Sequence, residues 1–368
     1  MTPLEFRRRL HRRPELSFEE HETAAFIERQ LAEAGIPCRR IARTGVLAAL
    51  EGRGDPRRAV VLRADIDALP IRERADVPWR SEREGAMHAC GHDVHAAVLY
   101  GTLVRLAARR DFEGTIFGLF QPGEECNPGG ASLVLAEEPF AGYDVRAVVG
   151  EHVEPALEVG TLGFRAGKYM AANDELRFTV RGRGGHGALR GQLTDPVAAA
   201  AELVTALLAL NTPECVLSIG RIEAAGATNV IPDEVRMEGT LRVFGDAERA
   251  AAEKRIGELA RGTDSRHGTA TDTEISRGYP CVVNDPALTA LAAALARSAG
   301  FRVEMLPLRT TAEDFGFYCR VYPSLFYRLG VGAAAGRPHT SSFSPDEGAI
   351  DAGIGFMGRL ALQILNRQ

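Results

Sequence analysis

Helical spacing and short apolar runs alternate along the first 165 residues of the chain. Apolar positions with helical periodicity predict three helices, at 18–35, 91–110 and 129–138. Short apolar runs between them predict three buried strands, at 59–65, 115–121 and 145–153. Because strands that alternate with helices form mostly parallel sheets covered on both faces, this region predicts an α/β domain.

The pattern changes after about residue 166. Alternation of polar and apolar positions predicts half-exposed strands, at 173–184, 215–222 and 234–244. Helical spacing predicts helices between and after them, at 195–210 and 248–262. The resulting strand–helix–strand–strand–helix–strand order predicts a small α+β domain of ferredoxin-like type. From about residue 278 the α/β character returns, with a helix at 286–299, a strand at 324–330 and a final helix at 347–366.

We therefore predict a catalytic domain with a mixed, mostly parallel sheet, formed by 1–165 and 278–368. The segment 166–277 is predicted to be an inserted α+β domain of ferredoxin-like type. A length of 368 residues is long for one domain and comfortable for two.

Charge and composition exclude several classes of protein. The net charge is −5 and the arginines are scattered, which disfavours nucleic-acid binding. The arginine clusters 7–9 and 12–13 fall in an apparent amphipathic helix and are interpreted as its solvated face. The only lysines are Lys168 and Lys254, and no Gly-Lys-Ser/Thr occurs, which disfavours Schiff-base chemistry and a Walker P-loop.

Location is inferred from what the chain lacks. No apolar run approaches the roughly 18 residues of a membrane span, and the first 20 residues are charged throughout, without an apolar signal core. The six cysteines have irregular spacing, which does not make a disulfide framework. We therefore expect a cytoplasmic protein that binds neither membrane nor nucleic acid.

The densest chemical signal is the segment Met-His-Ala-Cys-Gly-His-Asp-Val-His at 87–95. Thiolate and imidazole donors two residues apart, at Cys90 and His92, can meet one small cation or a close pair of cations. A structural cluster is the alternative. We expect His88 and His95 to support the site and not to bind metal themselves.

Two carboxylate motifs follow buried strands. Glu124 and Glu125 come directly after the strand at 115–121, so one can bind metal while the other carries a proton. Taken alone, such a pair is often a surface feature, but the carboxyl ends of strands in α/β sheets are where active sites gather. Asp65 and Asp67 follow the strand at 59–65, where an aspartate can orient a ligand histidine or cap a loop.

Two further histidines are ambiguous by themselves. His152 lies inside an apolar strand, where a satisfied core histidine is the alternative to a ligand, and His339 lies in a loop. Other hydrolase classes are disfavoured, because the chain has neither the HExxH helix of zinc proteases nor the G-x-S-x-G of serine hydrolases. A thiol nucleophile at Cys90 and a non-catalytic binding protein remain as rival hypotheses.

These motifs, in this order, resemble the M20 metallopeptidase family, and within it the amidohydrolase branch of aminoacylases, hippurate hydrolases, N-acetyl-diaminopimelate deacetylases and auxin-conjugate hydrolases. The resemblance spans nearly the whole chain and is carried by the segments at 11–23, 63–70, 87–95, 120–131, 150–152, 182–188, 229–242, 313–315 and 339–343. The most specific of them is MHACGHD.

The resemblance implies that two divalent ions, zinc or manganese, are held by Cys90, His92, Glu125, His152 and His339. It also implies roles for two other carboxylates: Glu124 is the general base and Asp67 orients a ligand. Asp65 stands where other branches of the family place a ligand histidine, and Cys90 compensates for it.

The inserted segment is expected to be a lid and dimerisation domain, because it must leave and return for the flanking ligand candidates to meet. In similar enzymes the histidine that matches His186 binds substrate or its oxyanion, often from a neighbouring subunit, and Asn229 would help as a neutral donor. Arg242 is a candidate clamp for a substrate carboxylate, with a surface arginine as the alternative.

The function that the resemblance implies is metal-dependent hydrolysis of the amide bond in N-acyl amino acids or short peptides, by a homodimer or higher homo-oligomer. A dipeptidase or carboxypeptidase of the same family is the alternative. The chain departs from its relatives at Gly123 and Cys126, beside the glutamate pair, and at 188–192, which puts transfer of any one relative's substrate in doubt.

Overall fold

The computed structural model describes residues 1–367, which form two compact units. Unit 1 comprises Met1–Gly167, Val283–Pro307 and the chain from Asp314 onward; unit 2 comprises Lys168–Val282 and Leu308–Glu313. Two short strands, β7 (Gly167–Met170) and β14 (Val282–Asn284), lie where the chain passes from one unit to the other. The predicted assignment of 166–277 as a separate functional domain stays a prediction.

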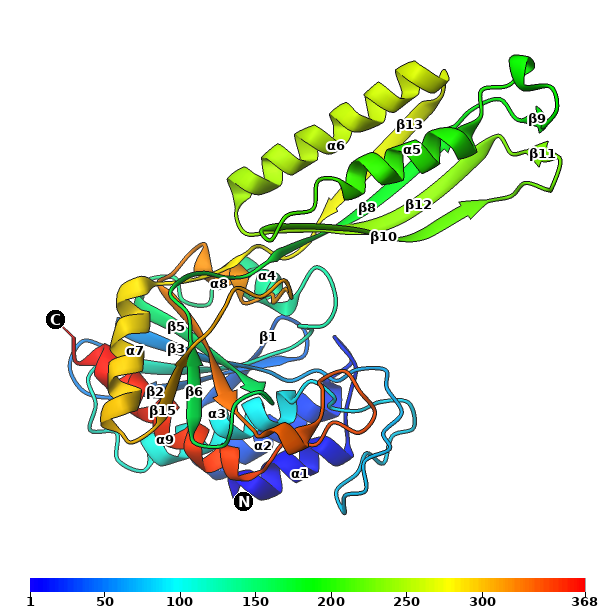
Figure 1. Ribbon diagram of the computed structural model, residues 1–368. Coiled ribbons are helices and arrows are strands. Elements are labelled where there is room, and N and C mark those ends of the chain that lie inside the picture. Colours follow the sequence, from blue (N-terminus) through cyan, green and yellow to red (C-terminus); the bar gives the residue numbers. More distant parts are fainter. Residues whose placement is uncertain (368) are drawn as a thin grey trace. The chain divides into compact units, whose positions relative to one another are not determined.

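Unit 1 is built on an eight-stranded mixed sheet (Figure 1). In sheet order its strands are β1 (Cys38–Ile41), β2 (Gly45–Glu51), β4 (Thr115–Gln121), β3 (Arg58–Asp65), β5 (Asp144–Glu154), β16 (Ser324–Gly330), β6 (Thr161–Phe164) and β15 (Arg302–Met305). The central strands β4, β3, β5 and β16 run parallel, whereas β1–β2, β2–β4 and β16–β6 are antiparallel pairs. The predicted mixed, mostly parallel sheet is confirmed; β1, β2, β6 and β15 were not predicted.

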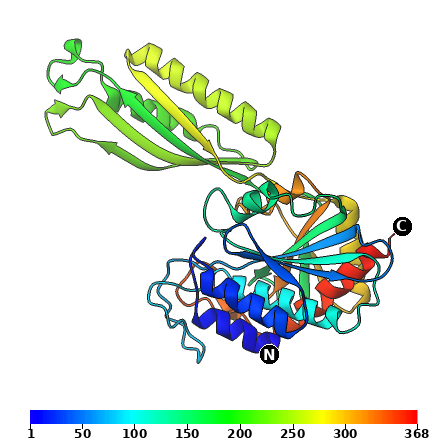
Figure 2. The ribbon, with the colours of Figure 1, turned by 180° about the vertical axis from the view of Figure 1, so that it is seen from behind.

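Helices cover this sheet on both faces. They are α1 (Pro3–Arg12), α2 (His21–Glu33), α3 (His92–Ala107), α4 (Gly130–Ala136), α7 (Pro286–Ser298), α8 (Gly316–Cys319) and α9 (Gly348–Leu365). Figure 2 views unit 1 from the side of α1 and α2, in blue. Local sequence explains where two of them start: Thr2 forms a capping box with Glu5 at α1, and Asp285 caps α7 ahead of Pro286.

Strand β4 shows how the sheet separates its two faces. Gly118 lies against the side chain of Leu103 on α3, and a Cβ at Gly118 would come within 2.4 Å of it. Phe117, one residue before, points the other way and packs against Phe140 and Tyr143, with ring centroids 5.2 and 4.9 Å away. Because successive side chains point to opposite faces of the sheet, β4 is buried on both faces, as its continuous apolar run predicts.

Unit 2 is an α+β unit of ferredoxin-like order. Its elements in chain order are β8 (Ala172–Arg181), α5 (Pro196–Leu208), β10 (Cys215–Ala224), β12 (Glu234–Val243), α6 (Asp246–His267) and β13 (Ala270–Arg277). The sheet order is β10-β12-β8-β13 with every pair antiparallel, which confirms the predicted type. Both helices lie on one face of the sheet, over a core that includes Phe178, Leu203, Met237 and Ile256 (Figure 1). A two-stranded ribbon of β9 (Gly185–His186) and β11 (Val230–Ile231) extends from it.

Two expectations about the N-terminal segment were wrong. The helix predicted from residue 18 begins at His21, because Phe18 has a left-handed backbone with φ of 64° and cannot start it. The first arginine cluster is not a solvated face: Arg7 is fully buried, with its Nε 2.6 Å from Oδ2 of Asp93 on α3. Helical periodicity could not reveal this, because α1 packs against α3 through polar as well as apolar residues.

Within residues 1–367, α9 is the one helix long and apolar enough to cross a membrane, with a mean hydropathy of 1.2. Most of it (61%) is buried inside the protein, and Phe356, Met357 and Leu360 are fully buried. The helix therefore packs as a core helix of unit 1.

Candidate metal centre

The centre is organised where β3, β4 and β5 end and α3 begins. His92 is the first residue of α3, and Cys90 lies just before it. Gly91 between them has φ of 93°, and a Cβ there would come within 2.6 Å of Val153 on β5. Only glycine allows both the left-handed turn and this close approach, so Gly91 brings Cys90 up to the end of β5.

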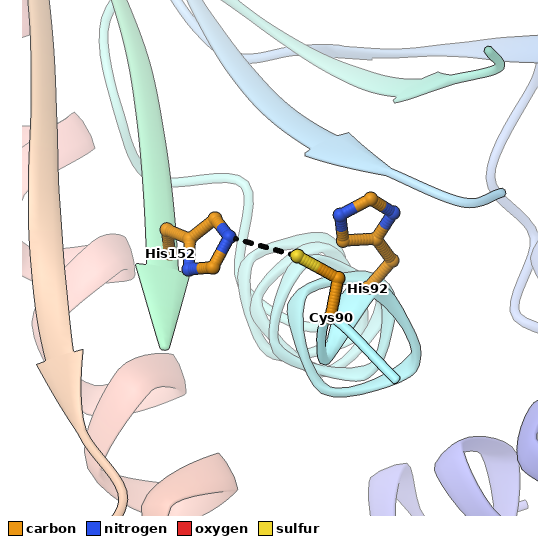
Figure 3. A group of neighbouring side chains, drawn as sticks. All are labelled: Cys90, His92 and His152. Atoms are coloured by element: carbon orange, nitrogen blue, oxygen red, sulfur yellow. Dashed lines mark hydrogen bonds between the residues drawn. The ribbon is translucent and has the colours of Figure 1, made fainter. Parts of the chain in front are cut away.

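Cys90 lies beside two other predicted ligands from distant parts of the chain, His152 and His339. Its Sγ lies 3.3 Å from Nε2 of His152 on β5, which Figure 3 shows, and 3.3 Å from Nε2 of His339. The same Nε2 of His339 lies 3.2 Å from Oε1 of Glu125. His339 sits in a loop with φ of 61°, held by its N–H, which donates to the carbonyl of Ala89 at 2.8 Å.

Two of the predicted ligand imidazoles, those of His92 and His152, are oriented by a bond from Nδ1. His92 Nδ1 donates to Oδ1 of Asp67 at 3.1 Å and lies 3.0 Å from the Asp67 carbonyl oxygen. His152 Nδ1 donates to the carbonyl of Val153 at 2.8 Å. In both cases Nε2 is left to face the centre, which is the arrangement that fixes the tautomer of a metal-binding histidine.

The remaining carboxylates surround His92. Its Nε2 lies 4.0 Å from Oε2 of Glu124, 3.9 Å from Oε1 of Glu125 and 3.8 Å from Oδ1 of Asp65. This Nε2 is buried and has no hydrogen-bond partner among residues 1–367. A buried polar atom that faces several carboxylate oxygens without a partner fits a site meant for a cation.

Burial and charge shift the titration of these groups. Burial raises the pKa of the Cys90 thiol to about 12 and lowers the pKa of His152 well below its usual range. Burial acts in the same way on His92, but the negative charge of Asp65 and the other groups around the ring, among them the bond to Asp67, together outweigh it and raise that pKa. A thiol with so high a pKa is a poor free nucleophile, because the thiolate is the reactive form.

The donor atoms form overlapping groups that could hold metal ions. Cys90, His92 and His152 form one group, Cys90, Glu125 and His339 a second, and within each group the donor atoms lie within 4.8 Å of one another. Cys90 belongs to both. Thiolate, imidazole and carboxylate together suit divalent transition ions such as zinc.

His95 and Asp65 are already engaged with other protein groups. His95 Nδ1 donates to Oδ1 of Asp65 at 2.6 Å, and its Nε2 accepts from the N–H of Val153 at 2.9 Å. Asp65 also accepts from Nη1 of Arg63 at 2.5 Å. His88 is buried with its ring centroid 6.3 Å from that of His11, and burial lowers its pKa to about 4.

Sequence reasoning assigned no role to the buried network behind Asp65. Arg63 donates from Nη2 to Oδ1 of Asp314 at 2.8 Å and from Nε to Oε1 of Gln121 at 2.9 Å, and Tyr318 donates to the same Oε1. These bonds tie the ends of β3 and β4 to the segment before α8. Arg63 and Asp314 belong to the motifs at 63–70 and 313–315, but only the fold shows that these two motifs meet.

The three predicted substrate-binding residues all lie in unit 2, and the structure brings only two of them together. His186 pairs with Val230, and Gly187 N–H donates to the carbonyl of Asn229 at 2.9 Å, so His186 and Asn229 lie side by side at the β9–β11 ribbon. Both side chains are exposed. Arg242 lies at the other end of β12, where its Nη1 donates to the carbonyl of Thr310 at 3.1 Å.

Comparisons with known proteins identify the family of this chain. The model of peptidase family M20/M25/M40 matches residues 61–363. An N-acetylcysteine deacetylase of Bacillus subtilis is 35% identical over 98% of this chain and 96% of its own, and an N-acetyldiaminopimelate deacetylase of Exiguobacterium sibiricum is 34% identical over 94% and 95%.

Solved structures agree as well. A Bacillus subtilis protein described as a dinuclear metal-binding peptidase from the M20 family is 35% identical, with a TM-score of 0.89 over 99% of this chain and 97% of its own. A putative aminohydrolase from methicillin-resistant Staphylococcus aureus is 32% identical, with a TM-score of 0.93 over 99% and 96%. The resemblance inferred from the sequence motifs is confirmed, and the chain is a hydrolase that belongs to peptidase family M20/M25/M40.

Proposed function

We propose that this protein is a metal-dependent amidohydrolase that cleaves the amide bond of small N-acyl amino acids. The observation that carries the proposal is the meeting of Cys90, His92, Glu125, His152 and His339 within unit 1, with the carboxylate of Glu124 beside them.

We propose that two divalent ions, zinc or manganese, occupy this centre. The residues that would hold the ions are those of two overlapping donor groups, Cys90 with His92 and His152, and Cys90 with Glu125 and His339. The fit rests on the unpartnered Nε2 of His92 and on the donor set. Once bound, such ions act as Lewis acids, which polarise a carbonyl and make a water molecule acidic.

The chain's own residues then move the protons. Glu124 is buried at the edge of the ligand set and takes a proton from the attacking water, which it returns to the leaving amine. Asp67 holds His92 through Nδ1 and accepts at 2.9 Å from the N–H of Glu125, so it orients ligands on two elements at once. The products are a carboxylate and an amino acid.

A free α-carboxylate on the substrate is the second part of the proposal. Arg242 is the candidate partner, because a guanidinium pairs with a carboxylate through two parallel bonds. The deacetylases among the relatives act, by their names, on N-acetylcysteine and N-acetyldiaminopimelate, both acylated amino acids. A dipeptidase or carboxypeptidase activity is the alternative, supported by the peptidase description of the matched family.

Unit 2 is proposed to act as the lid and as the contact of a homodimer. Arg242 and Glu234 are eight residues apart on β12, roughly 26 Å at the usual rise of a strand, and the His186–Asn229 ribbon lies beyond the Glu234 end. One small substrate cannot reach both ends within one chain. If His186 and Arg242 bind the same substrate, they come from two subunits.

A cytoplasmic location is part of the same proposal. All six cysteines are free, including the exposed Cys126 beside the centre. Reduced thiols are typical of the cytosol, whereas secreted proteins tend to pair them.

A substrate panel tests the function. Purified enzyme, supplied with manganese, zinc or cobalt, is assayed on N-acetyl and N-benzoyl amino acids, on dipeptides, and on the same compounds with the α-carboxylate amidated. We expect turnover of free N-acyl amino acids, loss of activity with chelator and poor cleavage of the amidated forms. Dipeptide cleavage alone would favour the peptidase alternative, and activity that survives chelation but not thiol alkylation would support Cys90 as the nucleophile. No turnover of any compound would support a binding protein.

A further inference from the structure

The loop that carries the glutamate pair is held at two backbone amides by two buried carboxylates. Gly123 N–H donates to Oε1 of Glu20 at 2.8 Å, and Glu125 N–H donates to Oδ2 of Asp67 at 2.9 Å. The residues on either side of Glu124 are therefore both anchored through their backbone N–H groups. Asp67 already has a role as a ligand orienter, whereas nothing so far explains Glu20.

Glu20 is itself fixed in place. Its side chain is fully buried, and its second oxygen, Oε2, accepts from the hydroxyl of Thr44 at 2.5 Å. Burying a carboxylate is costly unless its oxygens find donors. One of its two donors belongs to the β1–β2 turn and the other to the loop before Glu124, so Glu20 joins these two segments.

Strained backbone gathers around the same loop. Phe18, Ala42 and Arg43 have φ of 64°, 47° and 71°, a region that residues with side chains rarely adopt. The ring of Phe18 covers Gly123, where a Cβ would come within 2.4 Å, and Arg43 lies 5.0 Å from the centre of that ring. Strained residues persist where their surroundings hold them, and they cluster at functional sites.

The β1–β2 turn also touches the loop directly. A Cβ at Gly45 would come within 2.7 Å of Cδ of Pro122, so the turn packs against the start of the loop with no space between them. Ser17, on the same segment as Glu20, donates to Oδ2 of Asp67 at 2.7 Å. The segment 17–20 thus supplies one of the two carboxylates that anchor the loop, Glu20, and bonds to the other, Asp67.

We propose that Glu20 is a positioning residue for Glu124, which it holds in place through the N–H of Gly123. The proposal rests on the proposed function, in which Glu124 carries the proton. A proton carrier must stay within hydrogen-bond reach of the reacting water, and a misplacement of about 1 Å can lower a rate by about 10²-fold. The strained segments adjoin both donors to Glu20: the ring of Phe18 covers Gly123, and Ala42–Arg43 directly precede Thr44.

The first test is the variant Glu20→Ala, which removes both acceptors. We expect kcat to fall by about 10- to 100-fold with KM and bound metal little changed, because the ligand set does not include Glu20. In the purified enzyme, hydrogen–deuterium exchange of a peptide covering 120–127 should become faster. This second readout does not depend on turnover.

The conservative variant Glu20→Gln should keep most of the native kcat and the slow hydrogen–deuterium exchange of 120–127. Its amide oxygen can still accept from Gly123 N–H, while its amino group donates to the hydroxyl of Thr44, which can act as an acceptor. A role that depended on the negative charge of Glu20 would not be rescued. Should Glu20→Ala fail to fold, Glu20→Met fills the same space without an acceptor and supports the same comparison.

Glu15 provides a matched control. It is also a buried glutamate of this segment, but it accepts from the N–H groups of Thr23 and Glu22, at 2.7 and 3.3 Å, in the first turn of α2. Glu15→Ala should lower the melting temperature and leave kcat and the exchange of 120–127 unchanged.

Three results would overturn the proposal: unchanged kcat and loop exchange in Glu20→Ala, equal losses in Glu15→Ala, or no recovery in Glu20→Gln. Glu124→Gln separates these failures from failure of the proposed function. If Glu124→Gln keeps full turnover, the function proposed for Glu124 is wrong whatever Glu20 does. If it is inactive while Glu20→Ala is fully active, only the role of Glu20 is wrong.

Discussion

The candidate functional residues of unit 1 and unit 2 differ in how they are held. In unit 1, His92 and His152 are buried, and each is oriented by a bond from its Nδ1. In unit 2, His186 and Asn229 are exposed on a two-stranded ribbon, and the ring Nδ1 of His186 accepts from the nearby N–H of Ala188 at 3.2 Å. Preorganised groups can carry out chemistry within one chain, whereas exposed groups on a ribbon need a second surface to become part of a site.

Two ion pairs, one from each unit, differ in the same way. Arg7 and Asp93 form a pair with no exposed side-chain surface, and Asp93 also accepts from Nδ1 of His11 at 2.7 Å. In unit 2, the uncovered face of the sheet carries cross-strand pairs such as Arg221 with Glu238, with about half of each side chain exposed. Charge therefore fixes local structure at the Arg7–Asp93 pair, whereas at the Arg221–Glu238 pair it mainly solvates the surface.

The largest effect is expected at the glutamate pair of unit 1. Glu124→Gln should lower kcat by several orders of magnitude and keep bound metal, because it removes a proton carrier but not a ligand. Glu125→Ala should lose metal, because its carboxylate lies with Cys90 and His339. Metal content and kcat are measured for both variants. Equal metal loss in both would contradict the division of roles between Glu124 and Glu125.

The next effect concerns stability. Arg7→Ala leaves the charge of Asp93 buried without its guanidinium partner, which should lower the free energy of unfolding by about 3–5 kcal/mol. Arg221→Ala, on the exposed sheet of unit 2, should change it by less than about 0.5 kcal/mol. Chemical denaturation of both variants measures the contrast. Similar values would show that burial does not distinguish the two regions.

A third prediction tests whether His186 works across a subunit contact. His186→Ala should lower kcat by roughly 10²-fold, the size expected for one oxyanion donor, with metal content intact. If the histidine comes from the partner, mixing this variant with Glu124→Gln should restore part of the activity, since one mixed site is then complete. Exchange of subunits without any recovery would place His186 in its own subunit's site or outside the reaction.

The smallest catalytic effect is expected at Arg242. Arg242→Ala should raise KM about tenfold for free N-acyl amino acids, because it removes a charge-assisted pair to the carboxylate, and should leave kcat nearly unchanged. Amidated substrates provide the control, since they lack the charge that Arg242 would bind. An equal loss on acids and amides would mean that Arg242 supports the fold of unit 2 through Thr310 and does not contact substrate.

The local pattern of apolar and polar residues predicted most elements. It failed where the conformation or burial of a residue depends on tertiary contacts. The strands at 115–121 and 324–330 have the predicted bounds, because their continuous apolar runs are buried on both faces. The hairpin of β1 and β2 was missed because its turn uses Ala42 and Arg43, residues that seldom adopt the left-handed backbone found there. The buried face of α1 was missed because a buried arginine does not follow apolar periodicity.

The sequence by itself determined the family, the alternation of elements and the set of donor residues, since each depends on motifs or on spacing along the chain. Only the tertiary structure decided which donors meet: Cys90 lies 249 positions before His339, yet their side chains are in contact. It also showed that Glu20, which lies in the 11–23 motif but received no role from the sequence, bonds to the loop of Glu124. The physical reason is that spacing encodes local conformation, whereas the approach of distant side chains depends on how strands and turns pack.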